Sequence, residues 1–148
     1  MPDRNVIGTA PFAERTPSSR HFTPVMNSPF VANIADIPWQ EYPGHFGGAL
    51  SKALVRPETC GARRIDHRIS CYQPMAHVAE HTHKVQEQVY HVLDGEGILT
   101  LNDERRVMRR HDYVFVPPGV RHSFTNSGLV PLVFLVVTTP VEDGEAPL

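Results

Sequence analysis

From about residue 50 onward, apolar positions come in short runs that are separated by glycine, proline, asparagine and aspartate. Runs of this kind are typical of β-strands joined by tight turns. The pattern predicts strands at 50–56, 63–72, 76–83, 87–94, 97–102, 105–109, 113–116, 121–126 and 131–138. Strands this short and closely spaced favour an all-β fold, either an antiparallel barrel or a sandwich.

The first third of the chain has a different pattern, because seven of the fourteen prolines lie within the first 43 residues. Proline fixes φ and has no backbone donor, so this region should form neither long helices nor central strands. We expect an irregular arm over 1–45, least regular over 1–28, with a short extended element at 34–39. The barrel domain should then occupy 46–148. The best helix candidate, 41–52, contains glycines that argue against it.

Size and charge limit the possible partners. The chain has 148 residues, which is enough for one domain with a sizeable core, and a net charge of −2. This balance gives no electrostatic reason to expect nucleic acid or an anionic membrane as a partner. The chain has no apolar run of about 20 residues, no secretory-type N-terminal segment and only two cysteines. We therefore expect a cytoplasmic protein whose partner is a small-molecule substrate.

Histidine is the compositional exception, because seven of the nine histidines fall between residues 67 and 122. His81 and His83 are one residue apart, so in an extended segment both imidazoles project from the same face. A third imidazole, His122, follows the turn sequence at 117–121. Neutral imidazole is a good ligand for several transition metals. The histidines therefore predict one divalent metal ion per chain, with Zn, Fe, Ni and Mn all suitable.

Two segments resemble the signature motifs of the cupin superfamily. The first motif, G-x5-H-x-H-x3/4-E-x6-G, corresponds to 75–95, and the second, G-x5-P-x-G-x2-H-x3-N, corresponds to 111–126. The matching residues are His81, His83, Gly95, Pro117, Gly119, His122 and Asn126. Met75 and His111 stand where the motifs open with glycine. The resemblance implies a jelly-roll-like antiparallel barrel of six to eight strands, with the metal in its mouth.

The family's acidic ligand has no clear counterpart. The spacing back from Gly95 reaches Gln88, whereas the shorter spacing from His83 reaches Glu87. A strand fixes the register to Gly95, while the preceding loop can absorb an extra residue, so we prefer Gln88 as the fourth ligand and keep Glu87 as the alternative. A glutamine ligand leaves the full divalent charge on the ion and makes it a stronger Lewis acid.

Two residues are candidates for moving a proton. Tyr90 shares a strand face with Gln88 and is either a proton donor or acceptor or a core tyrosine. His77 has the parity of His81 and His83, so it is either a general base in the pocket or a surface imidazole. Phe124 and Asn126 share the parity of His122 and are candidates for walling the pocket and tying the strand. Arg68, Tyr72 and Arg121 are candidate contacts for a substrate anion, or else solvated side chains. Trp39 and Phe46 either form a lid or pack in the core.

The resemblance implies three possible functions. The first is a metal-dependent isomerase, cyclase or lyase that uses Lewis-acid chemistry on a small enolisable carbonyl or carboxylate substrate. The second is an iron-dependent dioxygenase, and the third is a non-catalytic cupin that binds a small molecule or a metal. The neutral ligand set favours the first. The proline-rich arm and the exposed sheet edges predict a homodimer.

Overall fold

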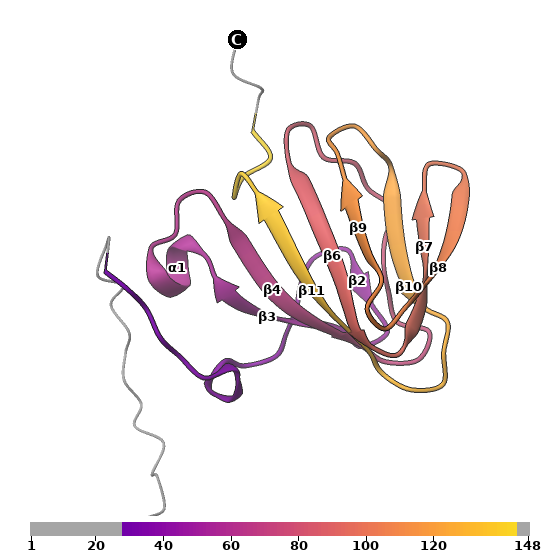
Figure 1. Cartoon of the computed structure of the whole chain (residues 1–148), viewed down its shortest axis with the longest axis horizontal. Coiled ribbons are helices and arrows are strands. Elements are labelled where there is room, and N and C mark those ends of the chain that lie inside the picture. The colour runs from indigo at the N-terminus through magenta and orange to yellow at the C-terminus, as the bar shows by residue number, and fades with distance from the viewer. Residues whose placement is uncertain (1–27, 145–148) are drawn as a thin grey trace, which may run out of the picture.

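The computed structural model describes residues 28–144, and its strands form two antiparallel sheets that face each other (Figure 1). The six-stranded sheet has the order β1 (Gln40–Glu41), β3 (Ala49–Val55), β4 (Asp66–Tyr72), β11 (Leu132–Thr139), β6 (Glu87–Asp94) and β9 (Tyr113–Val116). The five-stranded sheet has the order β2 (His45–Phe46), β5 (His77–Val78), β10 (His122–Asn126), β7 (Glu96–Leu101) and β8 (Glu104–Arg109). The predicted all-β antiparallel fold is confirmed.

The core lies between the sheets and consists of side chains that point inward from strands of both sheets. Tyr90, Phe124 and Phe134 form its centre, with ring centroids of Phe124 and Phe134 4.9 Å apart. Leu99 and Leu132 are fully buried beside them. Each large side chain of this kind contributes roughly 1.5–3 kcal/mol through burial. This apolar cluster fixes the spacing of the two sheets and leaves a cavity at one end.

The two positions where the cupin motifs open with glycine adopt the conformation that glycine favours. Met75 has φ 70° and His111 has φ 74°, both in the left-handed region. Gly95 also has a positive φ of 78°, and a Cβ there would lie 2.5 Å from the carbonyl oxygen of Pro131. A non-glycine residue in this region costs about 1–2 kcal/mol. Met75 and His111 carry that cost, whereas a side chain at Gly95 would in addition collide with the backbone of Pro131.

Several predicted elements differ from those observed. The predicted strand 76–83 is short, because only β5 (His77–Val78) pairs as a strand. The backbone beyond it bonds to loops instead: the Ala79 N–H donates to Gly44, and the Gly119 N–H donates to His83. The extended element expected at 34–39 is wrong at its start, where residues Ile34–Asp36 form a 3-10 helix, η1.

Two further elements were not predicted. A short helix, α1 (Pro57–Cys60), begins with proline, whose missing N–H is no loss at a helix start. Residues 40–45, which the sequence analysis placed in the arm, supply β1 and the first residue of β2 to the two sheets. The arm's first 27 residues lie outside the described residues. No helix in the described part of the chain is long and apolar enough to cross a membrane.

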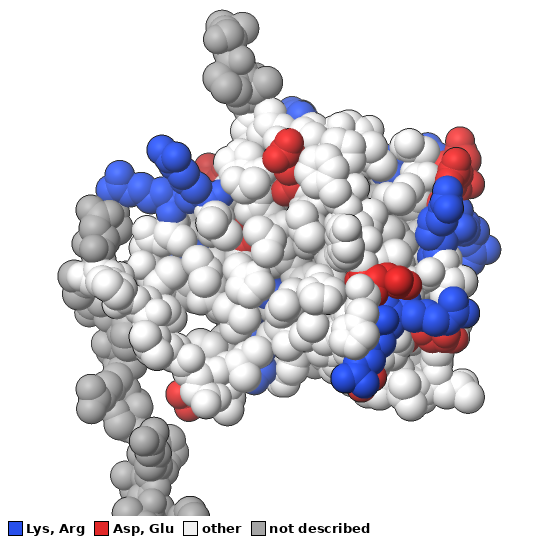
Figure 2. Space-filling model, viewed as in Figure 1, with Lys and Arg blue, Asp and Glu red and all other residues white. Residues whose placement is uncertain are grey.

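Charge is unevenly distributed over the surface. Charged side chains gather at the β7–β8 edge, where Arg106 pairs with Glu104 and Arg109 pairs with Glu96, whereas the central face over β4, β11 and β6 is largely uncharged (Figure 2). This central face is the outer side of the six-stranded sheet. The other side of the same sheet faces the cavity.

Candidate metal centre

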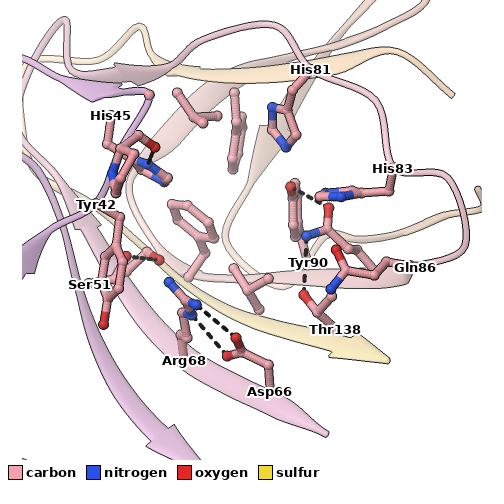
Figure 3. A pocket seen from close by; sticks show the side chains of 18 of the residues that line it. Tyr42, His45, Ser51, Asp66, Arg68, His81, His83, Gln86, Tyr90 and Thr138 are labelled. Atoms are coloured by element: carbon pink, nitrogen blue, oxygen red, sulfur yellow. Dashed lines mark hydrogen bonds and ion pairs between the residues drawn. The ribbon is translucent and has the colours of Figure 1, made fainter. Parts of the chain in front are cut away.

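A cavity of about 450 Å³ opens between the sheets and is bordered on one side by the apolar core, including Tyr90, Phe124 and Phe134. Its wall comes from the inward side chains of β3, β4, β6 and β11, and from the loops at 42–45 and 79–86 (Figure 3). The volume is within the usual range of small-molecule sites. His81 and His83 project into it from the loop that joins β5 to β6.

Three imidazoles that are distant in the sequence come together at this cavity. His81, His83 and His122 each offer a ring nitrogen, and these atoms lie within 4.8 Å of one another. Two backbone hydrogen bonds, His81 N to His122 O at 3.0 Å and His122 N to His81 O at 2.8 Å, hold the two segments side by side. The prediction that His122 meets the His81–His83 pair is confirmed.

The surroundings of each ring leave Nε2 available as the ligand atom. Nδ1 of His81 lies 2.8 Å from the Ala79 carbonyl oxygen, and Nδ1 of His122 lies 2.9 Å from that of Val120. A carbonyl only accepts, so in both rings Nδ1 carries the proton. Nδ1 of His83 faces a carboxylate oxygen of Asp143 at 3.6 Å. Metal-bound histidines are oriented by such partners.

One ligand atom has no protein partner. Among the described residues, Nε2 of His83 is buried and makes no hydrogen bond. A buried polar atom of this kind costs about 1–3 kcal/mol unless something satisfies it. A divalent ion between the three rings would satisfy it, so the residues present fit a metal ion.

The structure places Gln88 and Glu87 on opposite faces of β6. Gln88 is 8% exposed and turns into the cavity, whereas Glu87 is exposed on the outer face of β6. The Gln88 amide donates to the Thr138 hydroxyl at 3.1 Å, and its oxygen accepts from the Tyr90 hydroxyl at 2.9 Å. Gln88 is therefore the residue of the two that can join the histidines.

The contact between Gln88 and His122 also fits an ion. Nε2 of His122 lies 2.9 Å from Oε1 of Gln88. With the proton on Nδ1, this nitrogen presents a lone pair to an oxygen that also presents one. A cation bound by both atoms would account for the short distance between two acceptors.

His83 and His122 are held in the neutral form that binds metal. Burial, together with the nearby His81 and His83, lowers the pKa of His122 to about 4. Burial also lowers the pKa of His83, and the charge of His81 acts in the same direction. At neutral pH both rings keep a free lone pair.

The two candidate proton-moving residues have different positions. Tyr90 lines the cavity, but its hydroxyl is committed to Gln88 and burial raises its pKa well above the ordinary value. His77 is not among the described residues that line the cavity. Its ring lies against Phe46, with centroids 5.5 Å apart, and its Nδ1 contacts the Met75 carbonyl at 3.3 Å. The strand parity of His77 does not continue to His81, because the strand ends at Val78.

The remaining candidates divide in the same way. Arg68, Tyr72 and Phe124 line the cavity. Asn126 instead ties the strands, donating to the Tyr72 and Val130 carbonyls at 2.7 and 2.9 Å. Three more candidates lie outside the lining: Arg121 in exposed ion pairs with Glu80 and Asp103, Trp39 under Lys52, and Phe46 against His77.

Sequence reasoning missed two residues of the site. His45 enters the cavity from β2, with Nδ1 3.1 Å from the Pro43 carbonyl, and burial lowers its pKa. Asp143 lies on the segment after β11 and accepts backbone hydrogen bonds from Lys84 and Val85 at 2.9 and 2.8 Å. Neither residue is near a motif in the sequence, so only the folded chain brings them to the metal loop.

Comparison with known proteins supports the same fold. A family model described as a cupin domain matches residues 68–138. The chain belongs to the cupin superfamily. The structure of a predicted oxalate decarboxylase from Thermotoga maritima has a TM-score of 0.68 at 24% identity, covering 75% of this cupin and 99% of that chain. The polyketide cyclase RemF from Streptomyces resistomycificus has a TM-score of 0.67 at 24% identity, covering 78% and 81%. At these identities the likeness shows the fold.

Among curated proteins, this cupin is similar to the tetracenomycin polyketide synthase protein TcmJ of Streptomyces glaucescens. The two are 27% identical over 99 residues, which cover 67% of this chain and 66% of TcmJ. The chain is also 35% identical over 60 residues to the uncharacterized protein MJ1618 of Methanocaldococcus jannaschii, and this match covers 48% of that protein. The chain thus spans about half to two thirds of the length of these relatives.

Proposed function

We propose that this cupin is a divalent-metal-dependent enzyme that acts on an enolisable carbonyl substrate, with cyclase-type chemistry favoured over isomerase or lyase chemistry. The observation that carries the proposal is the convergence of three imidazoles and the Gln88 amide on one side of the cavity. His81, His83, His122 and Gln88 would hold the ion. Bound there, it would act as a Lewis acid that stabilises charge developing on a carbonyl oxygen.

The neutral donor set supports Lewis-acid chemistry. None of the four proposed ligands carries a charge, so the protein would not offset the positive charge of the ion. Glu87, which would have offset part of it, faces outward. Zn, Fe, Ni and Mn all accept imidazole and amide oxygen ligands.

The walls of the cavity suit an aromatic or polycarbonyl substrate. Tyr72, Phe124 and Phe134 line it with ring faces and edges, and the Tyr72 and Phe134 centroids are 5.0 Å apart. The similarity to TcmJ, a polyketide synthase protein, and the shared fold with the cyclase RemF agree with a substrate of this kind.

Proton transfer is assigned to His45 and not to His77. The N–H at Nδ1 of His45 donates a hydrogen bond to the Pro43 carbonyl, so Nε2 of the same ring has the free lone pair of a base. Burial lowers its pKa, which keeps the ring neutral and able to accept a proton near pH 7. Tyr90 retains its proton and positions Gln88 through their hydrogen bond.

Deuterium exchange tests this function without knowledge of the natural substrate. The zinc-loaded protein should catalyse exchange of the α-hydrogens of simple ketones and 2-oxoacids in D2O, followed by NMR under anaerobic conditions. A double variant, His81→Ala with His122→Ala, should lose the activity, as should the wild type after chelation. Turnover that requires oxygen would point to the dioxygenase alternative. Exchange that persists in the double variant would exclude metal catalysis, and binding without any turnover would favour a non-catalytic cupin.

A further inference from the structure

The wall of the cavity across from His81 and His83 is polar and carries charged side chains. Inward positions of β4 place Asp66, Arg68 and Ser70 on it, and Ser70 pairs with the Ser51 hydroxyl of β3 at 2.8 Å. Figure 3 shows Arg68 and Asp66 on one side of the pocket and His81 and His83 on the other. The sequence alternation of β4 therefore builds a second polar region, separate from the metal ligands.

Two guanidinium groups and one carboxylate lie in this part of the cavity lining. The Asp66 carboxylate is 5% exposed and is bonded by both Arg56 and Arg68. Of the described residues that line the cavity, Asp66 is the only acidic one, so two guanidiniums share one carboxylate. The outer partner of Arg56, Glu58, is exposed and lies outside the lining. The charges of these four side chains balance, so an anion would be held by the hydrogen-bond donors that an arginine's own partners leave free.

Arg68 has the geometry to bind that anion. It donates from Nε and Nη2 to the two Asp66 oxygens at 2.8 and 2.7 Å, which uses two of its five N–H groups. Its guanidinium carbon lies 4.2 Å from the ring centroid of Tyr42, which fixes the plane of the group. Nη1 makes no hydrogen bond within the described chain, so the edge formed by Nη1 and the second Nη2 hydrogen remains free. Such an edge fits a carboxylate through two parallel hydrogen bonds.

We infer that Arg68 binds a carboxylate at the end of the substrate farthest from the metal ligands. The inference rests on the proposed function and adds to it a substrate class: an enolisable carbonyl compound with an apolar or aromatic middle and an acidic far end. Val136 of β11 pairs with Arg68 on one side and with Tyr90 on the other, so an apolar side chain separates these two ends, and Tyr72 and Phe134 also line the cavity. Arg68 is then a specificity-determining residue and takes no part in the proton transfer.

Binding of matched probes to the zinc-loaded protein tests this inference. Benzoylacetone offers a diketone that can chelate zinc and has no acidic ring substituent. Its 3- and 4-carboxylate derivatives add the anion, and the corresponding carboxamides add the same bulk without charge. By calorimetric titration, the better carboxylate should bind the wild type about ten- to a hundredfold more tightly than its carboxamide, the usual gain from charge-assisted hydrogen bonds.

Two variants locate the effect. Arg68→Gln should remove the preference for the carboxylate, so that the carboxylate and its carboxamide bind with equal affinity. Arg121→Gln, which removes an exposed arginine outside the cavity, should keep the preference. No carboxylate preference in the wild type, or one that survives in Arg68→Gln, would overturn the inference while diketone binding upheld the metal site. Failure of all the diketones to bind would instead count against the proposed function. The wild-type comparison decides the matter even if Arg68→Gln does not fold.

Discussion

Acid should destabilise the metal-free protein, and His122 should be the main cause. In the folded chain the pKa of His122 is lowered to about 4 by burial and by the two neighbouring histidines, whereas the unfolded chain has the ordinary value of 6.5. Between these values the unfolded state binds the proton and the folded state does not. The free energy of unfolding therefore falls as the pH drops below 6.5 and levels off below about 4.

The size of this effect follows from the two pKa values. The full difference between 6.5 and about 4 corresponds to roughly 3 kcal/mol at about 1.4 kcal/mol per pH unit. About 2 kcal/mol of it should already be lost at pH 5. His122 is fully buried, so solvent screening does not reduce this figure. Domains of this size are stable by about 5–15 kcal/mol, so the loss is a large part of the total.

Denaturant unfolding followed by circular dichroism, with a chelator present, measures this pH dependence. The wild type should lose roughly 2 kcal/mol between pH 7 and pH 5 through His122, in addition to smaller losses of the same sign from His45 and His83, whose pKa values are also lowered by burial. His122→Asn should remove the larger share. His91→Asn, which changes a histidine on the outer face of β6, should behave like the wild type. The reasoning is refuted if His122→Asn retains the full acid sensitivity.

Two further predictions follow from the surroundings of the site. Burial alone would raise the pKa of Asp143, but hydrogen bonds from the loop backbone lower it, so the carboxylate is ionised where it faces His83. Asp143→Ala should weaken zinc binding about ten- to a hundredfold in a chelator competition assay, with Glu142→Ala as the unaffected control, and equal affinities would contradict the role. We also propose that a second copy covers the uncharged outer face of the six-stranded sheet, where Tyr113 and Phe115 are 76% and 53% exposed. Light scattering should give a dimer for the wild type and a monomer for Phe115→Glu, and a monomeric wild type would reject the proposal.

The sequence predicted those parts of the site that depend on local periodicity. Alternation along 87–94 put Gln88 and Tyr90 on one face and Glu87 on the other, because a strand fixes the side of every residue. The spacing to Gly95 favoured Gln88 and left Glu87 as the alternative, and the structure turns Gln88 and Tyr90 inward and Glu87 outward. The same argument failed at His77, where the strand stops after Val78 and the loop resets the direction of the chain. Periodicity therefore decides orientation only as far as the backbone ladder continues.

The residues that sequence reasoning missed depend on long-range pairing. His45 reaches the cavity because β2 pairs with β5, a contact between segments more than thirty residues apart. Asp143 reaches the metal loop through hydrogen bonds to residues 58 and 59 positions earlier. Neither contact leaves a local pattern in the sequence, since each depends on how the whole chain closes around the cavity.

The central claim is that one divalent ion is held by His81, His83, His122 and Gln88. Anomalous diffraction from zinc-loaded crystals, recorded at the zinc absorption edge, tests it most directly. The account predicts a single strong peak per chain, about 2.0–2.2 Å from the three Nε2 atoms and from the amide oxygen of Gln88. A peak elsewhere in the molecule, an ion bound through Glu87, or no peak at saturating zinc would contradict it.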